Sequence, residues 1–400
     1  MAHRNLAVAA LALLGLSLVG CATTDEYSSL PPSPKHPPGG TTTTPTTAVI
    51  PAPYLPGAEK LAPGDYADLL DRIRVGYGLP QAQHYAVERE IEWYRSRPDF
   101  LDRTFRRGAR YLHYIVTEIE RRDMPLELAL LPVVESAFNP VAYSRSRASG
   151  LWQFIPSTGK HYGLDQNWWI DERRDVLLAT DAALTYLQYL HDYFNGDWYL
   201  AIAAYNGGEG TVSRAVKRNA DAGRPTDFFS LDLKAETRDY VPKLLAISRI
   251  VADPAAYGLQ FEPIPNQPYF GIVDPGKQVH LGEAADLAGI SRDDMFALNP
   301  AFNRMTTPPN GPHRLLLPVA QVEPFRAALM SEEGAQRVAA AAVAPPPDTH
   351  HRVQRGENLT SIARRYDVPV ATLKQANNLR GSTIHPGDTL IIPGVPSSSA

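Results

Sequence analysis

A single carboxylate, Glu135, stands near the end of an apolar segment in the middle of the chain. Residues 130–138 read LLPVVESAF, so large apolar side chains flank the carboxylate on both sides. If Glu135 faces a cleft, loss of hydration disfavours its charged form and raises its pKa, which suits a general acid near neutral pH. Taken alone, the segment also fits an exposed carboxylate at a helix end.

Three later segments contribute polar side chains in a fixed order. Residues 149–156 read SGLWQFIP, residues 203–208 read AAYNGG, and residues 236–241 read ETRDYV. Together with Glu135-Ser136, these segments resemble the lysozyme-like catalytic domain of the lytic transglycosylases. Each tripeptide is a weak signal alone, and the four in register carry the resemblance, which covers roughly residues 85–255. Trp152 departs from the methionine of many relatives, in the variable position of its motif, where it could alter the shape of a subsite.

The resemblance implies a role for each matched position. Glu135 is the sole catalytic residue, first as acid and then as base, and Tyr205 orients it by a hydrogen bond. Two implied binding residues have structural alternatives: Asn206 could only cap a helix before two glycines, and Glu236 could only complement a helix dipole. Ser144 could simply be a loop residue. The implied substrate-binding residues are Ser144, Gln153, Tyr205, Asn206, Glu236 and Tyr240.

The implied activity is that of a peptidoglycan lytic transglycosylase, a carbon–oxygen lyase acting on polysaccharide in cell-wall turnover or remodelling. It cleaves the β-1,4 bond between N-acetylmuramic acid and N-acetylglucosamine without water and leaves 1,6-anhydromuramoyl products. Ordinary glycosidases use two carboxyl groups, whereas here the 6-hydroxyl of the muramate attacks C1. Two alternatives remain: a hydrolase of goose-lysozyme type on the same fold, and a non-catalytic lipoprotein that tethers the wall. No cofactor is expected, and no metal, because the histidines lack ligand spacing.

These side chains need a helical body to position them. Apolar residues recur at three- and four-residue spacing, which predicts helices, and no convincing alternating strand pattern appears between about 100 and 253. The sequence therefore predicts an all-α catalytic domain over residues 85–255, with Trp168 and Trp169 at the rim of its cleft. The predicted helices span 86–97, 100–121, 126–136, 176–194, 198–205, 211–219 and 235–252.

The C-terminal part of the chain resembles a second family. Residues 351–363 read HRVQRGENLTSIA and residues 385–393 read HPGDTLIIP, which resembles a LysM domain over 350–394. The resemblance implies a small α+β (βααβ) fold that binds peptidoglycan glycan strands; a non-binding spacer is the alternative. Residues 265–325 echo the same order as a degenerate LysM-like segment without the opening Gly-Asp/Glu turn. The implied glycan-binding residues are Gly356, Glu357, Asn358, Leu359, Thr360, Ile384, His385 and Pro386.

The remaining segments link and anchor these domains. Residues 330–349 predict an Ala/Pro linker, and His350 and His351 at its end are expected to be solvated. The proline- and threonine-rich residues 21–65 predict a disordered tether. Residues 1–20 predict a signal peptide, too short for a mature membrane span.

The only cysteine of the chain, Cys21, indicates what kind of signal peptide this is. A single cysteine excludes an intramolecular disulfide, and a formal net charge of −4 gives no reason to expect nucleic acid as a partner. The signal ends LVGC at Cys21, which resembles the lipobox of bacterial lipoproteins. This implies lipidation of Cys21 and, with Ala22 after it, a place on the periplasmic side of the outer membrane. An ordinary secretory signal with an incidental cysteine is the alternative. The predicted protein is a monomeric, multidomain lipoprotein: an all-α lysozyme-like catalytic domain, a degenerate LysM-like segment and a LysM domain.

Overall fold

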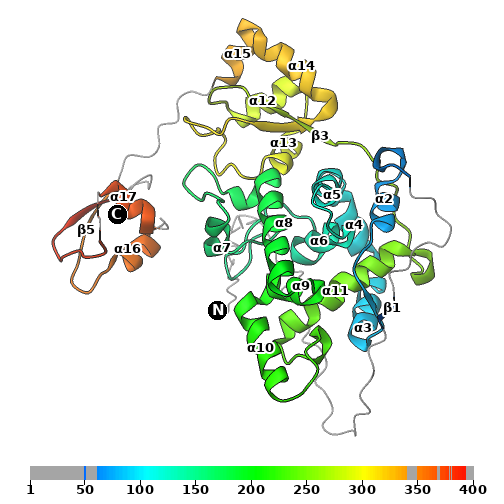
Figure 1. Ribbon diagram of the computed structural model, residues 1–400. Coiled ribbons are helices and arrows are strands. Elements are labelled where there is room, and N and C mark those ends of the chain that lie inside the picture. The colour runs from blue at the N-terminus through cyan, green and yellow to red at the C-terminus, as the bar shows by residue number, and fades with distance from the viewer. Residues whose placement is uncertain are drawn as a thin grey trace, which may run out of the picture. The chain divides into compact units, whose positions relative to one another are not determined.

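Helices dominate the first folded part of the chain (Figure 1). The computed structural model describes residues 61–339, 349–366, 370–377, 379 and 381–392, together with the short strand β1 (Val49–Ile50). The expected signal peptide, the lipidation site Cys21, nearly all of the tether up to residue 60 and residues 340–348 lie outside the described residues. Within the described ranges, no helix is both long and apolar enough to cross a bilayer.

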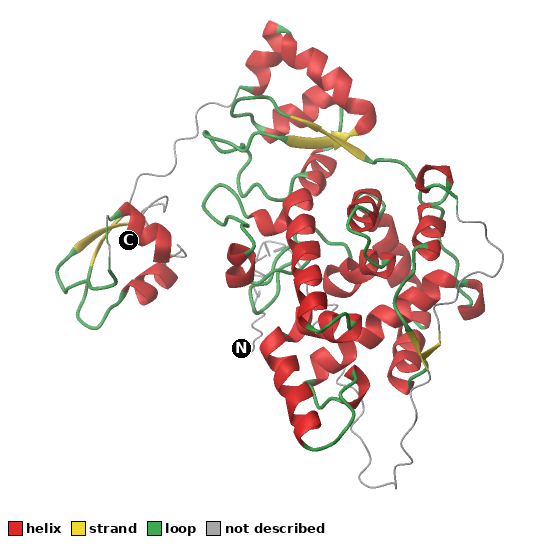
Figure 2. Ribbon diagram, viewed as in Figure 1, coloured by secondary structure: helices red, strands yellow, loops and turns green. Residues whose placement is uncertain are grey.

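Residues 61–262, here called the helical domain, consist mainly of helices (Figure 2). The catalytic candidate Glu135 lies in this domain. The α-helices are α2 (Leu69–Val75), α3 (Tyr85–Arg95), α4 (Pro98–Gly108), α5 (Leu112–Glu120), α6 (Leu131–Ser136), α7 (Pro156–His161), α8 (Val176–Tyr193), α9 (Trp198–Gly207), α10 (Glu209–Asp221) and α11 (Ala235–Ala252). Short 3₁₀ helices are η1 (Pro63–Asp65), η2 (Leu126–Leu130), η3 (Glu172–Arg174), η4 (Phe228–Ser230) and η5 (Ala255–Tyr257). Strand β2 (Gln81–Ala82) pairs antiparallel with β1.

Helix α11 runs through the core of the helical domain. It packs against α3, α9, α6 and α2, so its side chains are buried around most of its circumference. Val241, Leu244 and Ile247 on this helix have no exposed surface. Helices α2, α8 and α9 begin at aspartate N-caps: at the start of α8, for example, the Asp175 carboxylate accepts the backbone N–H groups of Leu177 and Leu178. Such N-caps satisfy donors that have no partner within the helix.

Two of the predicted helices are each divided in the structure. The segment 100–121 forms α4 and α5, separated at residues 109–111, where Tyr111 is buried and donates a hydrogen bond to Ala297 O at 2.8 Å. The segment 126–136 begins as η2 and continues as α6. Pro132 at the start of α6 lacks an N–H, and proline favours a helix start for that reason. Both corrections arise where tertiary contacts or proline override the apolar periodicity.

Residues 270–338, here called the LysM-like unit, fold around a two-stranded sheet. Strands β3 (Phe270–Val273) and β4 (Leu315–Pro318) are antiparallel, with Phe270 opposite Pro318. Between and after them lie α12 (Leu281–Ala288), α13 (Arg292–Leu298), α14 (Val319–Met330) and α15 (Glu332–Val338). Helix α15 occupies part of the segment expected to be linker, and its Val338 is fully buried in the core of the unit. The folded part therefore extends further than composition suggests.

The LysM domain repeats the strand–helix–helix–strand order. Strand β5 (Thr349–Arg352), α16 (Leu359–Arg365), α17 (Val370–Ala376) and β6 (Thr389–Ile392) form it, and the strands are antiparallel. His351, expected to be solvated, is instead buried in β5 and bonds Tyr366 and Glu357.

The LysM-like unit and the LysM domain share one local device. In the first, Asn299 exchanges two hydrogen bonds with the backbone of Leu316. In the second, Asn377 does the same with Ile391. An asparagine after the second helix thus fastens the second strand in both. The predicted fold class, a helical domain followed by LysM-like and LysM folds, is confirmed.

Candidate active site

Glu135 occupies the last turn of α6, and the backbone after it fixes its position. Ala137 and Phe138 both adopt left-handed conformations, with φ of 50° and 55°. Their N–H groups return to the carbonyls of Val133 and Pro132 at 3.2 and 3.0 Å, which closes the helix end. The Phe138 ring is fully buried and anchors this turn in the core, whereas Glu135 itself stays partly exposed.

A tyrosine from α11 contacts the Glu135 carboxylate. The hydroxyl of Tyr240, which is almost fully buried, donates a hydrogen bond to Glu135 Oε1. Burial raises the pKa of Glu135 to about 7, since loss of hydration outweighs the stabilisation of the anion by Tyr240 and Lys243. The negative charge of Glu236 also raises this pKa. Glu135 can therefore be both an acid and a base near neutral pH.

The turn formed by residues 149–154 lies beside the end of α6. Ser136 Oγ donates to Leu151 O at 2.9 Å, which ties the residue after Glu135 to this turn. Gly150 and Gln153 have positive φ angles of 86° and 48°. The Gln153 amide donates to Gly150 O at 2.9 Å and to Ala142 O at 3.2 Å.

Trp152 of the same turn is fully buried, and its indole N–H donates to Thr180 Oγ1 at 3.0 Å. Its side chain is part of the core, so it does not shape a subsite directly, contrary to expectation.

Tyr205 approaches the site from α9, and its contact differs from the expected one. Its hydroxyl donates to Trp152 O at 2.9 Å, so the hydrogen bond to Glu135 comes from Tyr240. Burial raises the pKa of Tyr205 well above its usual range, and the nearby charge of Glu135 adds to the effect. Tyr205 thus holds the 149–154 turn close to the carboxylate.

Three further predicted residues have definite places. Asn206 lies within α9, where its amide oxygen accepts from Thr237 Oγ1 at 2.9 Å; the helix cap is Gly208, so the capping alternative is wrong. Glu236 is exposed in the first turn of α11. Ser144 Oγ accepts from Ala148 N at 3.0 Å and bonds Ser146 Oγ within its own loop.

Trp168 and Trp169, expected at the rim of a cleft, instead contact the LysM-like unit. The Arg304 guanidinium lies 3.9 Å from the centroid of the Trp168 ring. Trp169 O accepts a hydrogen bond from Asn303 N at 2.8 Å.

A row of tyrosines on α8 was missed in the sequence. The Tyr186 ring lies 5.4 Å from that of Tyr205, and its hydroxyl donates to Glu209 at 3.1 Å. Tyr189 and Tyr193 continue the row and are exposed. The spacing of 186, 189 and 193 follows one face of a helix, which is the signal that could have found them.

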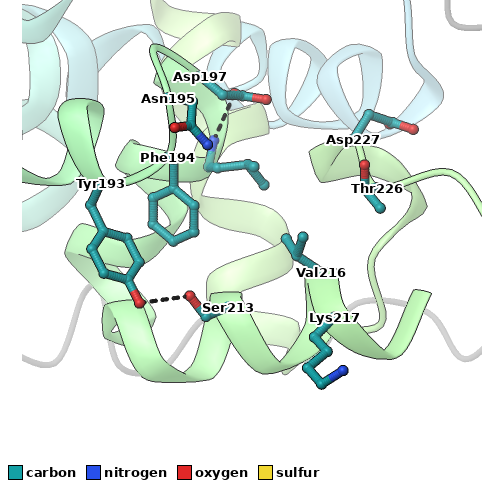
Figure 3. Close-up of a pocket in the computed structure, with 10 residues that line it drawn as sticks. Tyr193, Phe194, Asn195, Asp197, Ser213, Val216, Lys217, Thr226 and Asp227 are labelled. Atoms are coloured by element: carbon teal, nitrogen blue, oxygen red, sulfur yellow. Dashed lines mark hydrogen bonds between the residues drawn. The ribbon is translucent and has the colours of Figure 1, made fainter. Parts of the chain in front are cut away.

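The row of tyrosines ends at a cavity of about 620 Å³ (Figure 3). Ser213 Oγ donates to Tyr193 Oη at 3.1 Å on its lining, and Lys217 and Asp227 contribute charges to it. The residues singled out from the sequence do not line this cavity.

A second buried carboxylate, Glu127, was also missed. It accepts the N–H groups of Gly78 and Leu79, each at 2.9 Å. Burial raises the pKa of Glu127 to about 7 against the effect of these donors. These hydrogen bonds hold residues 78–79 against η2, so the role of Glu127 is structural.

The predicted LysM residues come from the loop after β5 with the first turn of α16, and from the loop before β6. Val353 N donates to Asp388 O and Gly387 N donates to Val353 O, both at 2.8 Å, so the loops after β5 and before β6 lie together. Thr360, His385 and Pro386 are exposed there, as is Gly356, while Ile384 packs partly against the core.

Other members of that set have structural contacts. Glu357 accepts Gln354 N at 2.8 Å and bonds His351 at 2.7 Å, and the backbone donor in particular lowers the pKa of Glu357. Asn358 caps α16, and Leu359 is buried in the domain core.

Family comparisons match three parts of the chain. The "Transglycosylase SLT domain" family matches residues 114–228, the "LysM domain" family matches residues 351–393, and the "Lytic transglycosylase MltD, LysM-like domain" family matches residues 270–334. Glu135, Gln153 and Tyr205 fall within the first match, and Tyr240 lies after it.

Individual proteins resemble longer stretches. A putative tributyltin chloride resistance protein of Alteromonas sp. (strain M-1) is 45% identical over 147 residues, which cover 37% of this chain and 67% of that protein. A solved structure of an inactive mutant of the lytic transglycosylase Slt from Pseudomonas aeruginosa is 25% identical, covers 38% of this chain and 25% of that one, and has a TM-score of 0.29. Membrane-bound lytic murein transglycosylase D of Escherichia coli (strain K12) is 37% identical over 345 residues, which cover 85% of this chain and 75% of that protein. By this extended similarity, the chain belongs to the family of membrane-bound lytic murein transglycosylase D.

Proposed function

We propose that this protein is a peptidoglycan lytic transglycosylase in which Glu135 alone carries the acid–base chemistry. Family membership supports the reaction class. The observation that carries the assignment of Glu135 is its contact with Tyr240: a partly buried carboxyl with a pKa of about 7 and one hydrogen-bond donor on its oxygen.

In the first step, protonated Glu135 gives its proton to the glycosidic oxygen between N-acetylmuramate and N-acetylglucosamine. The bond from that oxygen to C1 of the muramate breaks, and positive charge develops at C1 and the ring oxygen. The 2-acetamido group of the substrate stabilises that charge, so no second enzyme carboxylate is needed for it. Glu135 is left as the anion, which the Tyr240 hydroxyl stabilises.

In the second step, the Glu135 anion takes the proton from the 6-hydroxyl of the same muramate. The 6-oxygen then forms a bond to C1, which gives the 1,6-anhydro product and returns Glu135 to its acid form. The step is intramolecular in the substrate, and such positioned groups reach effective molarities on the order of 10⁵ M or more. Water is neither consumed nor activated.

The other residues around Glu135 support it in distinct ways. Tyr240 stabilises the anion between the two steps, and Tyr205 holds the Gln153 turn next to α6. Gln153, Ser144, Asn206 and Glu236 are the proposed contacts for the N-acetylated sugars. Glu236 also keeps the Glu135 pKa high through its negative charge.

The hydrolase alternative needs a second carboxyl group to activate water or to act as nucleophile. Among the groups that shift the pKa of Glu135, Glu236 is the other carboxylate, and it is exposed in the first turn of α11. No described contact orients it toward a position opposite Glu135. The arrangement thus favours the one-carboxylate reaction.

The C-terminal and N-terminal parts bring the enzyme to its substrate. We propose that the LysM domain binds glycan strands through the exposed residues Gly356, Thr360, His385 and Pro386. A weak binding module raises the local concentration of substrate for the enzyme. We also propose a monomer anchored by lipid at Cys21 on the periplasmic side of the outer membrane. Loss of incorporated radiolabelled palmitate in Cys21→Ser tests the anchor; full labelling of that variant contradicts it.

The role of Glu135 is tested by digestion of purified sacculi with wild type and Glu135→Gln. The substitution keeps the shape of the side chain and removes the transferable proton, so solubilisation should fall to background. Glu127→Gln is the matched control, because Glu127 is also a buried carboxyl with a pKa of about 7, and its carboxylate oxygens accept the backbone N–H groups of Gly78 and Leu79. Undiminished digestion by Glu135→Gln would overturn the assignment. A wild type that binds sacculi without digesting them would favour the tethering alternative.

A further inference from the structure

The helical domain and the LysM-like unit are joined by backbone pairing as well as by side chains. Asp171 N donates to Ala301 O and Asn303 N donates to Trp169 O, both at 2.8 Å. Between these bonds, Ile170 and Phe302 form an antiparallel bridge, and Ile170 is buried. Residues 165–175 of the helical domain thus run alongside the loop that follows α13.

Side-chain contacts reinforce this pairing at separate points. The Asn303 amide donates to Asn167 O at 2.8 Å and its oxygen accepts from Arg174. Arg110 pairs with Asp294 at 2.7 Å. Arg314, the residue before β4, forms an ion pair of 2.9 Å with Asp175, the N-cap of α8. Contacts on several different elements fix an orientation, which a single flexible attachment would not do.

The paired segment is connected directly to the turn beside Glu135. Asp171, whose N–H bonds Ala301, holds the Arg173 guanidinium by two hydrogen bonds of 2.9 and 2.7 Å. Arg173 is 4% exposed, and its remaining nitrogen donates to Arg147 O at 2.6 Å and to Phe154 O at 3.1 Å. The guanidinium therefore spans both ends of the 147–154 segment.

The fit between Arg173 and this segment is close. A Cβ atom placed on Gly150 would lie 2.1 Å from Arg173 O, so only glycine allows this approach. The same segment carries Gln153 in its left-handed conformation and bonds Ser136 and Tyr205 through the carbonyls of residues 151 and 152. Displacement of Arg173 would therefore shift the turn that borders Glu135.

We infer that the LysM-like unit is a fixed support of the active site, which positions the Gln153 turn through Asp171 and Arg173. Arg173 is a positioning residue, because its contacts are with protein carbonyls and a carboxylate. The surface of the LysM-like unit that faces residues 165–175 binds the helical domain, so it does not bind a glycan strand. The part of this inference that concerns catalysis rests on the proposed function. The part that concerns the position of the Gln153 turn rests only on the contacts described above.

The first test measures the turn without activity. Asn303→Ala removes the side-chain bonds to Asn167 O and Arg174 from an exposed position, so the protein should still fold. Amide hydrogen exchange over residues 147–154 should become faster in full-length Asn303→Ala than in wild type. Asn310→Ala is the matched control, because Asn310 is an exposed asparagine of the same unit outside this pairing. Unchanged exchange over 147–154 in Asn303→Ala, with the control also unchanged, would overturn the inference.

The second test uses kinetics on a soluble glycan strand. Arg173→Lys keeps the charge but loses the planar fork that reaches three partners, so kcat should fall about tenfold or more, as misplacement of catalytic groups does. The pH profile should stay the same, and any rise in KM should be smaller than the fall in kcat, because Gln153 on this turn is also a proposed sugar contact. Combining it with Asn303→Ala should give a smaller loss than the product of the single losses, because both act through one route. Strictly multiplicative losses, or a change in KM alone, would contradict the inference.

These outcomes separate the inference from the proposed function. If Glu135→Gln remains active, the proposed function fails, and the exchange result still decides whether the unit supports the turn. If wild type has the proposed activity and neither Arg173→Lys nor Asn303→Ala alters kcat, the support inference fails alone. Sacculus binding by Asn303→Ala in a Glu135→Gln background should equal that of Glu135→Gln. Weaker binding would assign this surface to glycan and overturn the inference.

Discussion

The hydroxyl of Tyr240 on α11 donates a hydrogen bond to Oε1 of Glu135 on α6, 105 positions earlier in the chain. The bond favours the ionised carboxylate, while burial favours the neutral acid more strongly. The result is a pKa of about 7, which leaves both forms available near neutral pH. A group that first donates and then accepts a proton needs this balance.

The Glu135 pKa gives a definite pH dependence. Because the first step uses the protonated acid, kcat/KM should fall as the pH rises through about 7. Tyr240→Phe removes a donor to the anion, so the Glu135 pKa should rise and this descending limb should move to higher pH. Profiles of kcat/KM for both proteins measure the shift. Movement of the limb to lower pH would show that Tyr240 does not stabilise the anion.

Tyr205→Phe is the matched counterpart on α9. Its hydroxyl bonds Trp152 O instead of Glu135, so the pH limb should stay where it is in wild type. Loss of the hydrogen bond should lower the free energy of unfolding by about 0.5–1.5 kcal/mol. Chemical denaturation and the pH profile check the two statements. A limb displaced as far as in Tyr240→Phe would show that the Tyr205 hydroxyl also acts on the Glu135 carboxylate, which would contradict the prediction.

Glu135→Gln should gain stability at high pH. The folded-state pKa of Glu135 is raised from 4.5 to about 7, so the folded protein binds more protons than the unfolded chain between these values. This contribution is fully present below pH 4.5 and is lost as the pH rises through 7. Relative to wild type, Glu135→Gln should be more stable at pH 8 than at pH 4 by on the order of 1–3 kcal/mol. Unfolding curves at the two pH values measure this difference, and its absence would mean that Glu135 is well hydrated.

Substitutions in the LysM domain should distinguish residues that bind glycan from residues that hold the fold. In a Glu135→Gln background, Thr360→Arg places a large side chain at an exposed position in the first turn of α16 and should weaken sacculus binding about tenfold, or about 1.4 kcal/mol. Glu357→Ala removes the acceptor of Gln354 N and the partner of His351. It should expose the amides of β5 to hydrogen exchange, whereas Thr360→Arg should not. Equal binding by Thr360→Arg and its parent would place the glycan elsewhere.

Periodicity predicted the elements whose burial is uniform along the chain. Helix α11 has the predicted bounds, 235–252, because apolar residues cover several of its faces. The segment 100–121 carries an equally regular pattern but is broken near Tyr111, whose hydroxyl bonds a residue of the LysM-like unit. Such a partner, 186 positions away, leaves no mark on the local pattern.

The candidate site shows the same limit. Motif resemblance named both Glu135 and Tyr240, yet which tyrosine bonds the carboxylate depends on how α6, α9 and α11 pack. Trp152 lies next to Gln153 in a matched motif, but its hydrogen-bond partner is Thr180 in the core. Trp168 and Trp169 looked like surface aromatics because the unit that covers them lies more than a hundred residues further on. The sequence identified the residues of the candidate site, but their hydrogen-bond and packing partners depend on the tertiary structure.

The most direct test of the central claim is digestion of sacculi by wild type in water enriched in ¹⁸O, followed by mass spectrometry of the released muropeptides. If the muramate's own 6-hydroxyl closes on C1, the products end in 1,6-anhydromuramic acid and contain no ¹⁸O from the solvent. Products that end in reducing muramic acid labelled with ¹⁸O would show that water attacks C1, and would contradict the one-carboxylate mechanism.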